Sequence, residues 1–158
     1  MDKNLHLVGF SVGRETFGVP IASVREIVRV PEITAVPDVP DYIEGVINLR
    51  GRIIPVIDLR KRLGEKDIRP SKKNRVLVVE LDDKLVGMIV NSASEVLKIS
   101  PGNIETPPTM GPAGERSYVT GVGKLNGRLI ILLDLVNLLR SRDLQELSEL
   151  DESTTRTA

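Results

Sequence analysis

The chain contains two copies of one 22-residue segment, and this duplication constrains its fold more than any other feature. Residues 42–63 read YIEGVINLRGRIIPVIDLRKRL, and residues 118–139, 76 positions later, read YVTGVGKLNGRLIILLDLVNLL; ten of the 22 aligned positions are identical. Solenoid repeats have periods of about 20–50 residues, so the longer offset favours two similar small domains in tandem. Residues that both copies share are expected to serve the scaffold, and residues found in only one copy are candidates for function.

Short apolar runs separated by turn residues predict a chain made mainly of β-strands. Asp58 and Asp134 are each placed to cap a short helix that follows a strand. Residues 22–30 fit either a helical turn or a strand, and the pattern leaves both open. Short antiparallel strands avoid exposed edges by curling into closed barrels, so we expect two small β-barrels side by side. The expected strands are residues 5–12, 16–21, 43–49, 52–57, 75–81, 85–90, 118–125 and 128–133.

The domain division follows from where this pattern restarts. Residues 1–74 are expected to form the first barrel, with an N-terminal strand that it can share with the second, and residues 75–140 the second barrel. Apolar spacing from Leu135 to about Leu150 predicts a C-terminal helix. The third expected segment, residues 141–158, contains the C-terminal part of this helix and a disordered tail over residues 151–158.

Composition excludes several classes of protein. The 158 residues include no Cys, which excludes disulfides and fits a reducing compartment. His6 is the only histidine, so neither a zinc site nor a His-dependent catalytic triad is expected. The longest aliphatic run, residues 129–133, is far shorter than the roughly 20 residues of a membrane span, and no signal-peptide pattern is present. We therefore expect a cytoplasmic protein that has no enzymatic activity and needs no cofactor or metal.

The charge distribution leaves one alternative function open. Residues 50–75 contain ten basic and three acidic residues, although the formal net charge of the chain is zero. A small β-barrel that binds nucleic acid through this basic stretch is therefore the second hypothesis. Such a protein needs aromatic side chains on which bases stack. Tyr42 is the only one nearby, and its recurrence as Tyr118 indicates packing rather than recognition.

The two copies differ at the turn between their paired strands. The second copy has Asn126-Gly127, the favoured pair for a two-residue hairpin, and the first has Arg50-Gly51. Arginine is less favourable than asparagine where φ is positive, by about 1 kcal/mol. The scaffold does not require Arg50, and an exposed arginine suits bidentate pairing with a carboxylate or a carbonyl of a partner; the alternative is a solvated side chain without a role. The same comparison picks out, less sharply, Asn48, Pro55 and residues 60–62.

The first copy resembles the signature of CheW, the coupling protein of bacterial chemotaxis. Residues 45–59 match the long and specific pattern GVxNLRGxIxPVxDL, and the resemblance extends from about Leu5 to Leu139. Further matching segments are residues 17–20, 24–27, 86–90 and 127–134.

This resemblance implies two SH3-like five-stranded barrels and a non-catalytic adaptor, monomeric when isolated. It implies coupling of the cytoplasmic tips of methyl-accepting chemoreceptors to the regulatory domain of the CheA histidine kinase. The receptor helix would dock in an apolar groove between the barrels. The protein would be recruited to membrane-associated receptor arrays without inserting into the membrane or binding nucleic acid. By position, the segments tied to receptor coupling are Val24, Glu26, Ile27, Asn48, Leu49, Arg50 and Gly51.

Overall fold

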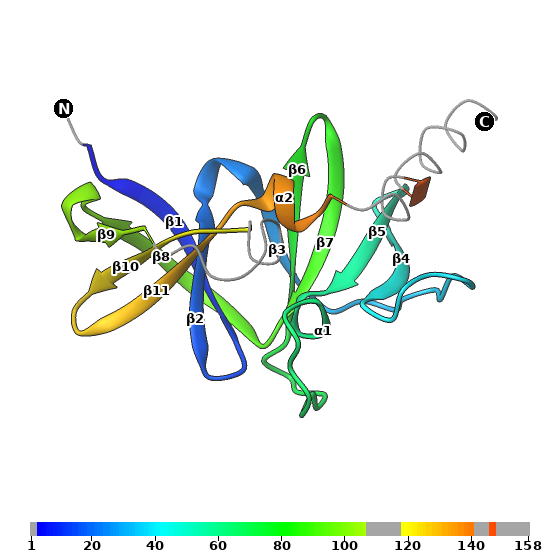
Figure 1. The fold of residues 1–158 in the computed structure, drawn as a ribbon. Coiled ribbons are helices and arrows are strands. Elements are labelled where there is room, and N and C mark those ends of the chain that lie inside the picture. The colour runs from blue at the N-terminus through cyan, green and yellow to red at the C-terminus, as the bar shows by residue number, and fades with distance from the viewer. Residues whose placement is uncertain (1–2, 107–117, 141–145, 148–158) are drawn as a thin grey trace.

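The computed structural model describes residues 3–106, 118–140 and 146–147, which fold mainly as β-strands (Figure 1). The mainly-β prediction is therefore confirmed. The strands are β1 (Leu5–Val12), β2 (Glu15–Pro20), β3 (Val24–Arg29), β4 (Ile43–Leu49), β5 (Arg52–Asp58), β6 (Arg75–Leu81), β7 (Lys84–Val90), β8 (Ser92–Ile99), β9 (Ile104–Glu105), β10 (Val119–Leu125) and β11 (Arg128–Leu133). The helical turns are η1 (Ile21–Ser23), α1 (Leu59–Arg62), η2 (Pro101–Asn103) and α2 (Leu135–Leu138).

The strands form two barrel-like sheets that lie side by side (Figure 1). The six-stranded sheet has the order β8-β1-β2-β11-β10-β9, and the five-stranded sheet has the order β3-β6-β7-β5-β4. Each sheet contains the strand pair of one repeat copy, β4–β5 in the five-stranded sheet and β10–β11 in the six-stranded sheet. The expectation of five strands in each barrel is met in one sheet, and the two-residue strand β9 adds a sixth to the other.

The sheets do not follow the predicted boundary between residues 74 and 75. The N-terminal hairpin β1–β2 is not merely shared, because it lies wholly in the six-stranded sheet, where it pairs with β8 and β11. The hairpin β6–β7 pairs with β3 and β5 of the first half in return. The two hairpins are thus exchanged between the halves of the sequence. The β2–β11 and β5–β7 pairings are parallel and join segments far apart in the chain, which local sequence patterns cannot reveal.

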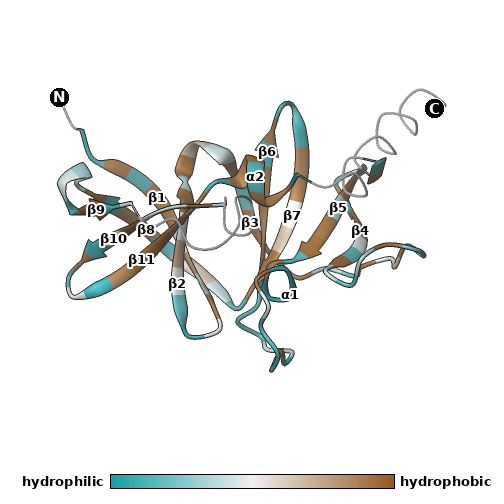
Figure 2. Cartoon of the chain, viewed as in Figure 1, coloured by the Kyte–Doolittle hydropathy of each residue, from teal (hydrophilic) through white to brown (hydrophobic). Residues whose placement is uncertain are grey.

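Residues 76–79 of strand β6 are all apolar and do not alternate between apolar and polar residues, because the strand is buried on both faces there. Val76 and Val78 point into the five-stranded sheet, and Leu77 and Val79 point into a central cluster shared by both sheets. All four side chains are fully buried, because both faces of the strand are covered. Hydropathy follows the same arrangement, since β5 and β11 are largely hydrophobic and the β6–β7 turn is hydrophilic (Figure 2).

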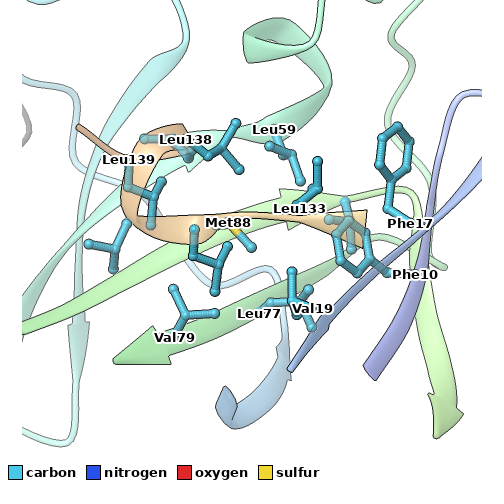
Figure 3. Close-up of a cluster of buried hydrophobic side chains, with 14 of the residues drawn as sticks. Phe10, Phe17, Val19, Leu59, Leu77, Val79, Met88, Leu133, Leu138 and Leu139 are labelled. Atoms are coloured by element: carbon cyan, nitrogen blue, oxygen red, sulfur yellow. The ribbon is translucent and has the colours of Figure 1, made fainter. Parts of the chain in front are cut away.

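The central cluster joins the two sheets into one hydrophobic core (Figure 3). Phe10 and Phe17 of the N-terminal hairpin have ring centroids 6.0 Å apart and belong to this cluster. Met88 reaches it from β7, and Leu138 and Leu139 reach it from α2 and the residue after it. Two smaller clusters fill the sheets themselves. They are Ile47, Ile54, Val56, Val76, Val78 and Ile89 in the five-stranded sheet and Leu7, Leu97, Ile99, Ile130 and Leu132 in the six-stranded sheet.

The helical elements confirm some predictions and correct one. Asp58 accepts a hydrogen bond from the backbone N–H of Arg60, and Asp134 caps α2 in the same way. Residues 22–30 contain both structures that the sequence left open, the end of η1 followed by β3. The predicted helix from Leu135 to about Leu150 is wrong as one element, because α2 ends at Leu138.

The C-terminal segment is described at two residues only. Glu146 and Leu147 are helical, and Leu147 is buried in the central cluster. The remainder of the segment, including the predicted disordered end, lies outside the described residues. Among the helices of the described part, none is long and apolar enough to cross a membrane.

Candidate functional site

The turn that carries Arg50 has the predicted geometry. Arg50 and Gly51 connect β4 to β5 with φ angles of 52° and 90°, and Asn126 and Gly127 connect β10 to β11 with φ angles of 50° and 78°. Both copies therefore use a two-residue turn with positive φ at both positions. In the first copy, Asn48 fastens the turn, because its Oδ1 accepts a hydrogen bond from the Gly51 N–H at 2.8 Å.

The guanidinium of Arg50 is held by Glu26 on β3. Its Nη1 donates to Glu26 Oε1 at 3.1 Å, and its Nη2 donates to Glu26 Oε2. The Arg50 side chain is nevertheless 70% exposed, whereas that of Glu26 is 27% exposed. Arg50 is thus neither buried nor a solvated side chain without a contact. It makes a bidentate pair within the chain, a partner that sequence reasoning missed.

Ion pairs of this kind join strands that are not adjacent in either sheet. β3 and β4 are the two edges of the five-stranded sheet, and Glu26 and Arg50 connect β3 to the turn after β4. In the six-stranded sheet, Glu95 of β8 lies 3.5 Å from Arg128 of β11. Glu95 lies 69 residues after Glu26, at the matching place in the second half of the sequence. A glutamate that recurs in both halves indicates a role in the scaffold, and this was visible in the sequence. The arginine at the tip of the turn is particular to the first copy.

The structure divides the seven predicted site residues into three sets. Val24 is half-buried against the central cluster, and Leu49 is half-buried against the interior of the five-stranded sheet. Ile27 is 40% exposed, and as the strand neighbour of Glu26 it points to the opposite face. The residues brought together at the turn are Glu26, Asn48, Arg50 and Gly51.

The ion pair shifts the titration of both partners. The hydrogen bond from Arg50 holds the pKa of the Glu26 carboxyl below its usual range; burial opposes this shift, and the positive charges of Arg50 and Arg25 add to it. The hydrogen bond to Glu26 and its negative charge raise the pKa of Arg50. Arg25 itself lies 3.1 Å from Glu80. Arg25 and Glu26 of β3 are thus each paired with a side chain of opposite charge.

The pKa of Glu26 is expected to rise toward its ordinary value in the variant Arg50→Asn. Asparagine is the residue that the second copy uses at this turn, so the turn is retained and only the guanidinium is lost. Because the folded pKa lies below the unfolded value of about 4.3, the stabilisation from the pair is present above pH 4.3 and is lost as the pH falls through the folded pKa. NMR titration of the side-chain carboxyl groups measures the pKa of Glu26 in the parent protein and in Arg50→Asn. Identical Glu26 titrations would contradict the pairing, and Asn126→Arg serves as a control that leaves Glu26 unaltered.

Four of the ten basic residues in the basic stretch, Arg50 among them, form ion pairs within the chain. Arg60 is buried and lies 2.9 Å from Asp58, Lys61 lies 2.7 Å from Glu44, and Arg69 lies 3.1 Å from Asp67. The pairing with Glu44 raises the pKa of Lys61. Tyr42 is half-buried against the central cluster rather than displayed for stacking. Nothing in this arrangement supports the nucleic-acid alternative.

No metal-binding arrangement is found in the described part of the chain. His, Cys, Asp and Glu side chains form no group of three or more there that could hold a metal ion. His6 lies half-buried on β1. The described site is therefore an exposed, ion-paired turn on a rigid sheet, which suits contact with another macromolecule.

Two barrel-like sheets with exchanged hairpins and this turn define a CheW-like domain. Residues 6–143 match the CheW-like domain family, and the chain belongs to that family. The chain is 36% identical over 137 residues to the chemotaxis protein CheW of Rhizobium meliloti, covering 87% of this chain and 88% of that protein. It is 35% identical over 137 residues to the chemotaxis protein CheW of Helicobacter pylori, covering 86% of this chain and 82% of that protein. The crystal structure of the scaffolding protein TtCheW from Thermoanaerobacter tengcongensis is similar with a TM-score of 0.80 and 38% identity, covering 88% of this chain and 94% of that one.

Proposed function

We propose that the protein is a non-catalytic adaptor that couples methyl-accepting chemoreceptors to the CheA histidine kinase. Family membership supports a role in chemotaxis, since relatives along most of the chain are named chemotaxis protein CheW and a solved relative is called a scaffolding protein. The observation that carries the proposal for this chain is Arg50, which is particular to one repeat copy, exposed, and held in place by Glu26.

The Arg50–Glu26 pair can present a prearranged donor to a partner. A guanidinium has five N–H donors, and the contacts with Glu26 use two of them. Arg50 therefore retains donors for a carboxylate or carbonyl of a partner while Glu26 holds its orientation. Fixing a side chain before binding lowers the entropy cost of association. Val30, just after β3, adds exposed apolar surface, a common component of an interface.

The proposal extends to partners and location. The protein would present one binding surface to the receptor and another to the kinase. Both surfaces are expected to be rigid because the two sheets share the central cluster. The signalling state of a bound receptor then affects the kinase only if it changes the preferred orientation of the kinase on its binding surface. The proposed partners are the CheA regulatory domain and the cytoplasmic tip of a chemoreceptor. The protein is proposed to be a cytoplasmic monomer in isolation that is recruited to membrane-associated arrays.

Arg50→Asn is expected to weaken partner binding by about 30-fold while leaving the melting temperature nearly unchanged. An arginine that acts as an interface hot spot contributes about 2 kcal/mol, whereas its exposed ion pair contributes little to folding. The partners are first identified by a pull-down from lysate, in which a histidine kinase and a chemoreceptor are expected. Calorimetric titration of the purified kinase regulatory domain and receptor fragment into each variant then gives the affinities.

The reciprocal variant Asn126→Arg is the matched control, because it places the same side chain on the equivalent turn of the second copy. It is expected to bind with unchanged affinity. Equal affinities of the parent protein and Arg50→Asn for both partners would refute the role of Arg50. A pull-down that contains neither a histidine kinase nor a chemoreceptor would refute the adaptor function itself.

A further inference from the structure

One side chain contacts both copies of the repeat where the two sheets meet. The guanidinium carbon of Arg62, on α1, lies 5.7 Å from the ring centroid of Tyr42 and 5.2 Å from that of Tyr118. Both distances are within the range of a cation–π interaction. The two tyrosines occupy the same position in the two copies, one just before β4 and one just before β10. Arg62 therefore lies against one ring from each sheet.

Each tyrosine is tied to its own sheet. The carbonyl oxygen of Tyr42 accepts a hydrogen bond from the Asp58 N–H at 2.7 Å, and the carbonyl oxygen of Tyr118 accepts one from the Asp134 N–H at 2.7 Å. Both rings also pack against the central cluster. A change in the angle or spacing between the sheets would consequently move the two rings relative to each other and disturb their contacts with Arg62.

The helix that carries Arg62 is also fixed. Arg60 is buried with its guanidinium on Asp58, and Lys61 reaches Glu44 at the start of β4. These contacts hold α1 on the five-stranded sheet, so that Arg62 projects from a fixed base toward Tyr118 of the other sheet.

The second copy shows that the fold does not require an arginine here. The residue at the position equivalent to Arg62 is Leu138, which is buried in the central cluster. A short helix after a capping aspartate therefore forms with leucine at this place. The contact that spans the two sheets is a feature of the first copy alone, as Arg50 is.

We propose that Arg62 is a positioning residue that fixes the relative orientation of the two sheets. The central cluster holds the sheets together, but apolar attraction has little directional preference. A planar guanidinium over two aromatic rings is directional, because it favours particular placements of both rings. The positioning role goes beyond the adaptor function. If the relative orientation of the sheets varies, a partner that contacts both sheets should bind less well. Only this consequence rests on the proposed adaptor function.

Paired spin labels test the positioning role directly. Because the chain has no Cys, two introduced cysteines are labelled uniquely. Lys98→Cys on β8 and Arg29→Cys on β3 place exposed labels on different sheets. In this background, Arg62→Ala is expected to shift or broaden the distance distribution from double electron–electron resonance by more than its original width. A distribution unchanged from that of the parent would overturn the proposal.

Two controls separate positioning from general damage. Arg69→Ala removes an exposed arginine that pairs with Asp67 in the loop between α1 and β6, and it should leave the distribution unchanged. A second label pair, Arg29→Cys with Lys84→Cys, lies within the five-stranded sheet and should be insensitive to Arg62→Ala. If Arg62→Ala fails to fold, Arg62→Leu replaces it, since leucine stands at the equivalent place in the second copy. An intra-sheet change as large as the inter-sheet change would also overturn the positioning role.

The affinity for the kinase regulatory domain tests the functional consequence. Arg62→Ala is expected to weaken binding by about three- to tenfold, the range that a loss of this kind of contact implies. The affinity of Arg62→Lys should lie between those of the parent protein and Arg62→Ala, because lysine retains the charge without the planar group. A changed distance distribution with unchanged affinity would confirm the positioning role and refute its consequence. If the parent protein binds no chemotaxis partner, the adaptor function fails, and the distance measurement still decides the role of Arg62.

Discussion

Replacing Gly45 with alanine is expected to lower the free energy of unfolding by about 3–5 kcal/mol, enough to unfold a marginal domain. Gly45 lies on β4 with φ at 143°, a conformation essentially restricted to glycine. An added Cβ would lie 2.0 Å from the carbonyl oxygen of Thr34 and 2.8 Å from its carbonyl carbon. Both are backbone atoms, so no side-chain rotation relieves the clash.

The clash would break a specific pair of hydrogen bonds. Thr34 N–H donates to Val46 O and Val46 N–H donates to Thr34 O, each at 2.9 Å, so the proline-rich loop covers the outer edge of β4. Moving Thr34 away to admit a methyl group leaves these polar groups without partners and exposes the edge. The loss is therefore expected to combine backbone strain with two lost hydrogen bonds.

Gly121→Ala is the matched control, because Gly121 is the same residue of the second copy. Its added Cβ would lie 3.0 Å from a side-chain carbon of Ile104 and 3.3 Å from the carbonyl oxygen of Glu105. Small displacements accommodate such contacts, so a loss of about 1 kcal/mol is expected. Urea unfolding followed by circular dichroism compares the two variants. Equal losses, or a Gly45→Ala protein as stable as its parent, would contradict the packing at Thr34.

Asp58→Ala is expected to cost about 3–5 kcal/mol, because it leaves the charge of Arg60 buried without its partner. Asp58 is 3% exposed and Arg60 is 6% exposed. Arg60 Nε donates to Asp58 Oδ1 and Nη2 donates to Oδ2, both at 2.9 Å. Asp58 also caps α1 through the Arg60 backbone, so the variant loses the cap as well. Chemical denaturation measures the loss.

Asp134→Ala provides the comparison within the same protein. Asp134 caps α2 and accepts from the Asn137 side chain at 3.1 Å, but the residue two positions after it is the exposed Val136 rather than a buried arginine. Its removal is expected to cost about 1 kcal/mol, the usual value of a helix cap. The double variant Asp58→Ala/Arg60→Leu should recover most of the loss, because it removes both buried charges. Asp58→Ala and Asp134→Ala proteins of equal stability would disprove the role of the buried pair.

Local structure was predictable from the sequence where local chemistry decides it. Strands β1, β4, β6 and β11 have the bounds that the apolar runs predict, because hydrophobic periodicity and turn residues act over a few positions. The turn at Arg50 was predictable for the same reason, since Gly51 and the Asn126-Gly127 pair mark positive φ. The helix after Asp134 was predicted too long, because leucine spacing alone does not show where a helix ends.

The candidate site was only partly predictable. Comparison of the two copies identified Arg50 as unnecessary to the scaffold, but it did not reveal that Glu26 holds it. Twenty-four residues separate the two, and nothing in the local pattern of either residue shows that the edge β3 approaches the turn after β4. The half-burial of Val24 and Leu49 was likewise not predictable from their motif, and their role in partner binding stays a prediction.

The sequence by itself determined the duplication, the strands, the two tight turns and membership of the CheW-like domain family, because each of these is written in short runs of neighbouring residues. Only the tertiary structure decided which hairpin completes which sheet, that Arg50 is held by Glu26, and that Arg62 lies between Tyr42 and Tyr118. These contacts join segments that are distant in the chain. Which distant segments meet depends on how all the apolar faces are buried together, a property of the whole fold and of no single stretch of sequence.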